Sequence, residues 1–245
     1  MKVFLFTVGL LSLILSNTIR AAEPLLFVTA EWAPYNFTRD GELTGFSTEI
    51  IQAMMAELGE SHEIRVYPGA RTTKVLDAQP NAVGFSYFRT PKRDNKYKWV
   101  GALVDEVIYL YKRKEDDRSF SSLEDARLVE GIVVSNKGII QAKLEALGFD
   151  NYTKFTNNKD QIKHVLQGRS DLLANFTPLG LAYYLRSMGE PLDSLVPTGV
   201  KLVEFSLSIA FSKEIPDPVI RRWQGALDAV RKSGVYERIY QKYQN

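Results

Sequence analysis

The chain has 245 residues, of which 45% are hydrophobic and 24% charged, with a formal net charge of +2 and no cysteine. A charge so close to zero does not favour nucleic acid as a partner. The lack of cysteine excludes disulfides, a cysteine nucleophile and an anchor attached through cysteine. A chain of this length must rest on hydrophobic cores, in one large domain or in two lobes of ordinary size.

Residues 1–22 have the pattern of a secretory signal peptide. Lys2 precedes an apolar run at 3–15, and the segment ends on two alanines. The run is too short to span a membrane, which takes about 20 apolar residues. Its removal takes away Lys2 and Arg20 and no acid, which leaves 29 of the 31 basic residues and all 29 acidic ones. We expect an exported, periplasmic protein that is uncharged overall and is not anchored to lipid.

The first half of the remaining chain alternates between predicted strands and predicted helices. Apolar residues at helical spacing predict a helix over 48–58, and Gly59 is suited to end it. Asp40 and Gly41 form a turn signal between two short extended pieces. The predicted strands are 25–30, 62–67, 82–87 and 107–111, and a second helix is predicted at 71–78.

The second half repeats this alternation after a charged run at 112–119, which we interpret as a solvated crossover. The predicted strands are 131–135, 154–155, 171–175 and 207–211, and the predicted helices are 139–147, 159–167, 219–230 and 235–243. Strands that alternate with helices indicate an α/β fold with a mainly parallel sheet.

The order of these elements predicts two α/β lobes, the second inserted in the first. The chain would cross between them twice, near 107–114 and 202–210, which makes a two-strand hinge with a cleft between the lobes. Lobe 1 is then 23–110 with 207–245, and lobe 2 is 111–206. Ligands lie beyond the carboxyl ends of strands in such sheets, and such lobes close around a ligand by hinge motion.

One segment, FSYFRTPKRDNKYKWV at 85–100, suggests an anion site. It places Arg89, Thr90 and Arg93 at the carboxyl end of a predicted strand, and Pro91 suits the first position of a helix. Free backbone N–H groups and a nearby guanidinium can together bind a carboxylate. From this segment alone a solvated basic turn is equally compatible with the sequence.

Four segments in order resemble the bacterial periplasmic solute-binding proteins of the polar-amino-acid type, extracellular solute-binding protein family 3. They are EWAPYNFTRDGELTGFSTEIIQAMMAELG, SYFRTPKR, VLQGRSDLLANF and LDAVRKSGVYERIYQKY. The likeness covers nearly all of the predicted mature chain, and RTPKRDNKYKWVGAL resembles a divergent branch. It implies a periplasmic-binding-protein-like fold, a small carboxylate ligand and an ABC-type permease as partner. It also implies a monomer that has no catalytic residue, cofactor or metal.

The resemblance also implies ligand-binding positions in both lobes. In lobe 1, an aromatic stacks on the ligand at Trp32, and Thr90 and Arg93 hold its carboxylate. In lobe 2, the turn that begins at Ser135 supplies N–H groups and a hydroxyl. The full predicted set is Trp32, Tyr35, Arg71, Ser86, Arg89, Thr90, Arg93, Ser135, Asn136, Lys137 and Asn175.

Two departures from the family pattern bear on the ligand. Thr29 and Phe176 stand where the amino-acid binders of the family place carboxylates for the ligand ammonium group. An ammonium buried without a partner costs several kcal/mol. Unless Glu31 or Glu204 substitutes, the sequence argues against a simple α-amino acid. It predicts an acidic or neutral carboxylate whose apolar part stacks on Trp32, rather than a cationic amino acid.

Several of these residues also have a purely structural interpretation. Trp99 and Trp223 are predicted to be packing residues. Arg89 could form an ion pair with Asp94 or with Glu106, and Arg71 could lie either in the cleft or on the surface.

An enzyme on the same scaffold is the alternative from another class. Proteins similar to this family include dehydratases that act on prephenate or arogenate. The two histidines, His62 and His164, are predicted on elements away from the cleft, and the sequence contains no nucleophile elbow or Walker loop. We therefore expect a binding protein. A ligand-sensing subunit for a membrane receptor would use the same closure and stays open at this point.

Overall fold

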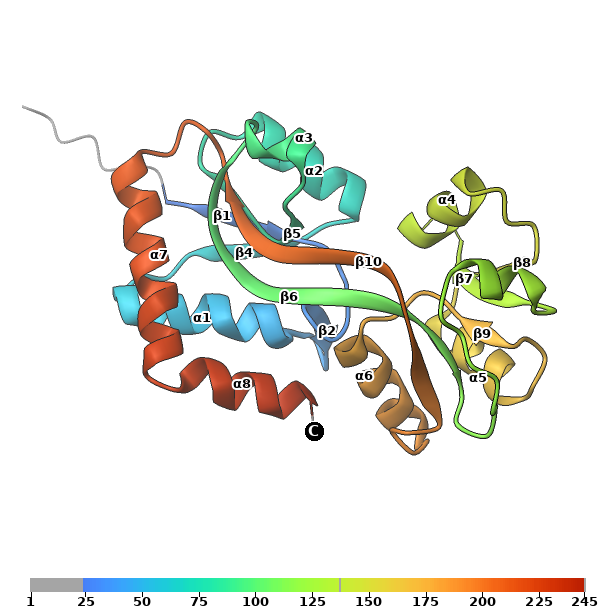
Figure 1. The fold of residues 1–245 in the computed structure, drawn as a ribbon. Coiled ribbons are helices and arrows are strands. Elements are labelled where there is room, and N and C mark those ends of the chain that lie inside the picture. The colour runs from blue at the N-terminus through green and yellow to red at the C-terminus, as the bar shows by residue number, and fades with distance from the viewer. Residues whose placement is uncertain (1–23, 137, 245) are drawn as a thin grey trace, which may run out of the picture.

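The structure, a computed structural model, describes residues 24–136 and 138–244, so the predicted signal peptide at 1–22 and Lys137 lie outside the described residues. The described chain is a mixed α/β fold (Figure 1). Its elements are β1 (Leu26–Thr29), β2 (Phe37–Arg39), β3 (Glu42–Thr44), α1 (Phe46–Leu58), β4 (Glu63–Val66), α2 (Gly69–Ala78), β5 (Ala82–Phe88), α3 (Pro91–Asp94), β6 (Lys98–Arg113), β7 (Ile132–Ser135), α4 (Ile139–Ala146), β8 (Tyr152–Phe155), α5 (Asn158–Leu166), β9 (Leu172–Leu173), α6 (Pro178–Met188), β10 (Leu195–Phe211), α7 (Asp217–Lys232) and α8 (Val235–Gln244), with a 3₁₀ turn at Glu124–Leu128.

The main sheet has the strand order β4-β1-β5-β10-β6-β9-β7-β8. Strands β4, β1 and β5 pair in parallel at one end, and β9, β7 and β8 pair in parallel at the other. We call the part built on β1, β4 and β5 the first lobe, and the part built on β7, β8 and β9 the second lobe.

Two long antiparallel strands join the lobes. β6 has 16 residues and β10 has 17, and in Figure 1 both run from the first lobe into the second. This arrangement confirms the predicted fold class, two α/β lobes joined by two strands. The exact division into 23–110 with 207–245 and 111–206 stays a prediction.

Each lobe has its own hydrophobic packing. In the first lobe, helices α1 and α7 bury one face each, with Ile51 and Trp223 completely inaccessible to solvent. In the second lobe, β7 is buried on both faces, because Ile132 packs in one cluster and Val133 in another. The predicted packing role of Trp223 is confirmed. Trp99 also packs, against the rings of Tyr87 and Tyr97.

Helix α6 contacts both lobes. Leu181 and Leu185 pack in a second-lobe cluster, whereas Leu179 belongs to the large first-lobe cluster and Tyr183 packs against that cluster. Near the other end of the helix, the Arg186 guanidinium donates hydrogen bonds to carbonyl oxygens at the end of α8. The helix therefore links the second lobe to the first through side-chain contacts as well as through the long strands.

Candidate ligand-binding cleft

A cavity of about 300 Å³ opens in the first lobe at the carboxyl ends of β1 and β5. This is the position where open α/β sheets bind ligands. We call it the first-lobe cavity. It is lined by Thr29, Ala30, Trp32, Asn36, Gly69, Thr72, Thr73, Phe85, Ser86, Tyr87, Phe88 and Arg93. Three residues predicted from sequence, Trp32, Ser86 and Arg93, therefore meet in one cavity.

Ser86 combines a strained backbone with an unsatisfied hydroxyl. Its φ is 53°, in the left-handed region that residues other than glycine seldom adopt. Its Oγ is buried and has no hydrogen-bond partner. The neighbouring hydroxyls of Thr29 and Thr72 differ, because they donate to the carbonyl oxygens of Phe85 and Thr29. Strain and an unpaired buried polar atom are typical of ligand sites.

Arg93 supplies a positive charge at the same cavity. Its guanidinium lies over the Tyr87 ring, 4.2 Å from the ring centroid, and its Nη1 donates to the carbonyl of Phe88. No carboxylate in the described part of the chain forms an ion pair with it. Arg89 differs, because its Nε lies 2.7 Å from Asp94 and its guanidinium lies over Trp99. One of the two alternative pairings of Arg89 is thus present, and Arg93 stays available for an anion.

The predicted helix start after Thr90 is shorter than the sequence suggested. Helix α3 covers only Pro91–Asp94, and the Thr90 side chain makes no cap hydrogen bond. A helix of one turn carries a weak dipole, so the guanidinium of Arg93 is the main attraction for an anion here.

Trp32 lies between the two lobes. Its ring packs on Tyr35 at 4.6 Å between centroids and stacks on Phe88 at 5.6 Å. It lines the first-lobe cavity and also a second, narrower cavity of about 40 Å³. We call this the small cavity, and its walls are Trp32, Ala33, Ile108, Asn158, Asn175, Phe176, Thr177, Gly180 and Tyr184. Trp32 and Asn175, both predicted site residues, thus line the same small cavity.

Tyr35 is predicted to be a ligand contact but is completely buried. Its ring lies behind Trp32, and its hydroxyl is 2.6 Å from the Glu106 carboxylate and 2.6 Å from the Thr177 hydroxyl. The loop that carries both aromatics is fixed to α1, because the carbonyls of Pro34 and Tyr35 accept the first N–H groups of that helix. Tyr35 therefore supports the cleft from behind.

Sequence reasoning treated Glu106 only as a possible partner for Arg89 and missed it as a functional candidate. Glu106 follows Val104 and precedes Ile108 and Leu110 on the buried face of β6, so it is an acid at an apolar position. That alternation was the available signal. Burial is the largest cause that raises the pKa of its carboxyl, from the ordinary 4.5 to about 7, and the Tyr35 hydrogen bond opposes the rise.

The remaining predicted residues do not line either cavity. The Arg71 side chain is exposed and lies over the Tyr67 ring. In the second lobe, Ser135 Oγ accepts a hydrogen bond from Gln161, and Asn136 is exposed. A Cβ placed on Gly138 would lie 3.3 Å from Ser135 and 4.0 Å from the Asn175 amide oxygen, so these two predicted residues are close in space. Their contact with a ligand stays a prediction.

The walls of both cavities contain no carboxylate among the described residues. Thr29 is buried at the end of β1, and Phe176 packs edge-on against Tyr184 within a second-lobe cluster. The two acids considered as substitutes have other partners, since Glu31 accepts hydrogen bonds from Thr38 and Glu204 pairs with Lys201. An ammonium group would therefore meet no carboxylate at the cavity walls.

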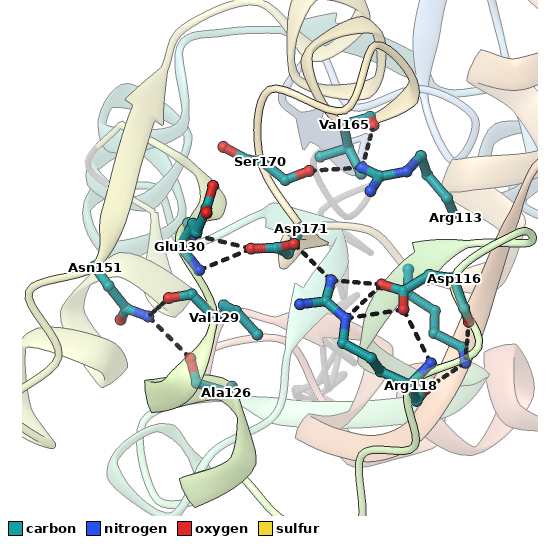
Figure 2. A network of polar contacts seen from close by, with 12 residues as sticks. Arg113, Asp116, Arg118, Ala126, Val129, Glu130, Asn151, Val165, Ser170 and Asp171 are labelled. Carbon is teal, nitrogen blue, oxygen red and sulfur yellow. Dashed lines mark hydrogen bonds and ion pairs between the residues drawn. The ribbon is translucent and has the colours of Figure 1, made fainter.

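Polar side chains away from the cleft stabilise the second lobe. Figure 2 shows Asp171 at the centre of one network, where it accepts backbone N–H groups of Glu130 and Gly131 and pairs with Arg118. Arg118 also pairs with Asp116, and the Arg118 contact lowers the pKa of that carboxyl to about 2. The partners in this network are internal, so we assign it to stability and not to binding.

The described residues contain no group of three or more histidine, cysteine or acidic residues that could hold a metal ion. None of their helices is long and apolar enough to cross a membrane.

Comparison with known proteins agrees with this architecture. The model of the bacterial extracellular solute-binding proteins, family 3, matches residues 26–245. A probable amino-acid-binding protein of Bacillus subtilis (strain 168), YxeM, is 24% identical over 228 residues, which are 89% of this chain and 82% of that protein.

Two solved structures have the same fold. An ancestral cationic amino acid solute-binding protein, AncCDT-1, has a TM-score of 0.73 at 21% identity, over 91% of this chain and 96% of its own. The second substrate-binding domain of a putative amino acid ABC transporter from Streptococcus pneumoniae Canada MDR_19A has a TM-score of 0.70 at 16% identity, over 90% and 100%. At such identities these structures are evidence for the fold alone.

Proposed function

The chain belongs to family 3 of the bacterial extracellular solute-binding proteins, and from this premise we propose that it binds a small carboxylate-bearing solute between its lobes. The members of this family are solute-binding proteins, so membership in it confirms the prediction that the chain is not an enzyme. The finer assignments, the ligand class and the partner, are proposals.

The observation that carries the proposal is that Arg93 and Ser86 line the same cavity. Arg93 offers a guanidinium that forms no ion pair within the described residues, although Asp77 lies near enough to feel its charge. Ser86 offers a buried hydroxyl without a hydrogen-bond partner. A carboxylate would satisfy both groups, through charge-assisted hydrogen bonds from the guanidinium and one from the hydroxyl. The unpaired hydroxyl would then cease to cost free energy.

The absence of carboxylates from the described cavity walls supports an acidic or neutral ligand. A second ammonium or a guanidinium on the ligand would be buried in the closed cleft without a counter-charge, which costs several kcal/mol. Trp32 and Phe88 supply aromatic surface for an apolar or planar portion of the ligand. Relatives with amino-acid names favour an amino-acid-like carboxylate, whose α-ammonium would need a counter-charge from outside these walls.

Delivery to an inner-membrane ABC permease is the second part of the proposal. It is supported by the family, whose fold neighbours include a domain of a putative amino acid ABC transporter. We further propose that the protein acts in the periplasm as a monomer after loss of its signal peptide. Closure around the ligand would present a defined surface to the permease.

Mass spectrometry of the protein after gentle purification tests the ligand class first, because a tightly held solute survives that procedure. Calorimetry then compares glutamate, glutamine, phenylalanine and phenylacetate with arginine and lysine. Arg93→Lys should lose most of the affinity, because an ammonium cannot form the bidentate pair. Arg89→Lys is the matched control, since Arg89 already pairs with Asp94, and it should bind normally. Equal affinity in wild type and Arg93→Lys would refute the proposed carboxylate site.

A further inference from the structure

A chain of hydrogen bonds runs from the start of α6 to the hinge strand β6. The Gly180 N–H donates to Thr177 Oγ1 at 3.0 Å, that hydroxyl lies 2.6 Å from the Tyr35 hydroxyl, and Tyr35 donates to Glu106 Oε1 at 2.6 Å. Since Tyr35 has a single proton and gives it to Glu106, Thr177 must be the donor in the middle contact. Every donor in this chain points toward the ionised carboxylate.

Glu106 lies close behind the ligand cleft. The ring of Tyr35 separates it from Trp32, and the centroids of these two rings are 4.6 Å apart. Trp32 in turn lines both cavities of the cleft. A charge on Glu106 and a charge on a bound solute would therefore be divided by aromatic rings and not by water, which weakens screening.

A separate opening gives Glu106 access to solvent. A hollow of about 370 Å³ is lined by Asp105, Glu106, Val107, Glu204, Phe205 and Ser206. None of these residues lines the first-lobe cavity or the small cavity. A proton can thus reach the carboxylate while a solute occupies the cleft.

The groups that face Glu106 are acids, phenols and the hydroxyl of Ser206. Asp105 and Tyr111 come from its own strand, Tyr35 from the loop, Tyr240 from α8 and Glu204 from β10 across the hollow. Glu204 is itself paired with Lys201. Burial and Asp105 raise the pKa of the Glu106 carboxyl to about 7, so small changes nearby alter its ionisation near neutral pH.

We propose that Glu106 takes up a proton when an anionic solute binds, and that it thereby makes the cleft select anions more strongly as pH falls. This inference rests on the proposed function. A negative charge on the solute in the cleft opposes ionisation of Glu106. One proton passes from solvent to the carboxylate, and no other bond changes.

The network can persist in the protonated state. The Glu106 O–H would donate to the Tyr35 oxygen, and the Tyr35 O–H would donate to Thr177 Oγ1, which has a second lone pair beside the one used by Gly180. The Glu106 and Tyr35 donors then have acceptors, whereas the Thr177 O–H gives up the Tyr35 oxygen as its acceptor. Protonation therefore changes the charge behind Trp32 without breaking the contacts that hold the loop.

Calorimetry with L-glutamate and phenylacetate as probes tests the inference. If the carboxyl has a pKa near 7 in the free protein and near 8 in the complex, affinity should rise about fivefold from pH 8 to pH 6. Repeating the titration at pH 7 in buffers of different ionisation enthalpy should show an uptake of about 0.4 proton per bound probe. Both probes stay anionic over this range, because a carboxyl titrates near pH 4.

Two variants locate the effect. Glu106→Gln keeps an oxygen that can accept the Tyr35 hydrogen bond and should bind the probes with no pH dependence and no proton uptake. Asp105→Asn is the companion variant. Because the Asp105 charge helps to raise the pKa of Glu106, this change should keep the pH dependence and the proton uptake but move both to lower pH. If Glu106→Gln fails to fold, the proton count of the wild type and the Asp105→Asn comparison still decide the matter.

The outcomes separate this inference from the proposed function. Binding of a probe by wild type without pH dependence, or tighter binding at pH 8 than at pH 6, overturns the inference and leaves the solute-binding function intact. A pH dependence that survives in Glu106→Gln also overturns it. If neither probe binds at either pH, the proposal of an anionic ligand falls, and the inference falls with it.

Discussion

The Tyr35 hydroxyl lies 2.6 Å from the Thr177 hydroxyl, although 142 positions separate the two residues in the chain. The contact joins the loop behind Trp32 to the start of α6, a helix that packs in both lobes. Because Tyr35 also donates to Glu106, a single phenol connects the aromatic wall of the cleft, a hinge strand and that helix. Its removal should affect both stability and closure.

Tyr35→Phe should destabilise the protein by about 1–3 kcal/mol, because it leaves the buried Glu106 without its donor and Thr177 with one partner fewer. Urea unfolding followed by circular dichroism measures this change. Tyr109→Phe is the control, since Tyr109 is half-buried on the same strand as Glu106, and it should change stability by a few tenths of a kcal/mol. Equal effects of the two substitutions would mean that the Tyr35 network contributes nothing beyond packing.

Glu106 should make the stability of the protein depend on pH in an identifiable way. Its pKa is raised from 4.5 to about 7 in the fold, so the folded state holds the proton more tightly than the unfolded chain does. Stability from this group is complete below the unfolded value and is lost as pH rises through the folded value. The loss can reach about 3 kcal/mol.

Glu106→Gln isolates this contribution from those of the other acids. The variant should be more stable than wild type at pH 8, and the difference should shrink toward zero at pH 5, because the wild-type carboxyl is then protonated. Denaturant unfolding at four pH values measures the difference. Asp105→Asn removes the neighbouring charge that helps to raise the pKa of Glu106, so it should keep the dependence of stability on pH but move it to lower pH. A wild type that is more stable than Glu106→Gln at pH 8 would contradict the raised pKa.

Ser86 allows strain and binding to be separated. Ser86→Gly should stabilise the fold by about 1 kcal/mol, because glycine adopts a φ of 53° without a steric penalty. The same change should weaken ligand binding, because it removes the buried hydroxyl that awaits a partner. Thermal unfolding and calorimetry measure the two effects.

Asp40→Gly provides the comparison for Ser86→Gly. Asp40 has the same φ of 53° but lies in the turn between β2 and β3, outside the cavity walls. It should gain stability without any loss of affinity. If Ser86→Gly binds as tightly as wild type, the hydroxyl takes no part in ligand recognition.

Arg93→Ala should weaken binding of the carboxylate by about 2–5 kcal/mol, as expected when one partner of a desolvated ion pair is removed. The fold should be little affected, since the side chain is only half-buried and forms no ion pair within the described residues. Calorimetry and thermal unfolding of the same preparation test both statements. Arg71→Ala, which removes an exposed guanidinium outside the cavity walls, is the control and should bind like wild type.

Local patterns predicted most of the fold but not its long connections. The helix at α1 was predicted because Ile50, Ile51 and Met54 follow helical spacing and Gly59 ends it, and the structure confirms this, with Gly59 at a φ of 65°. Strand β6 is longer than the predicted 107–111 because its first part contains polar residues and Gly101, which interrupt the apolar pattern. Pairing with β10 extends it, and pairing depends on distant sequence.

Helix α6 and the role of Glu106 are the two features that the sequence patterns did not predict. No helix is predicted over 178–188, although Thr177 and Pro178 make a regular helix start, with the Thr177 side chain as cap. The alternation along β6 places Glu106 on the buried face, but it does not identify the group that the carboxyl meets there. Its partner Tyr35 is 71 positions away, and no local rule connects them.

Cationic amino acids provide the most demanding test of the ligand class. The walls of the two cavities present Arg93 and no carboxylate in the described chain, and Phe176 fills a position within an apolar cluster. Arginine, lysine and histidine should therefore bind at least a hundredfold more weakly than the best neutral or acidic carboxylate, because a buried unpaired cation costs several kcal/mol. Thr29→Asp should partly reverse the preference by placing a carboxylate at the end of β1, and Thr38→Asp, on an exposed strand outside the cavity walls, is its matched control. Low-micromolar binding of arginine or lysine to the wild type would mean that an acid, Glu106 being the nearest buried one, pairs with the ligand in the closed state.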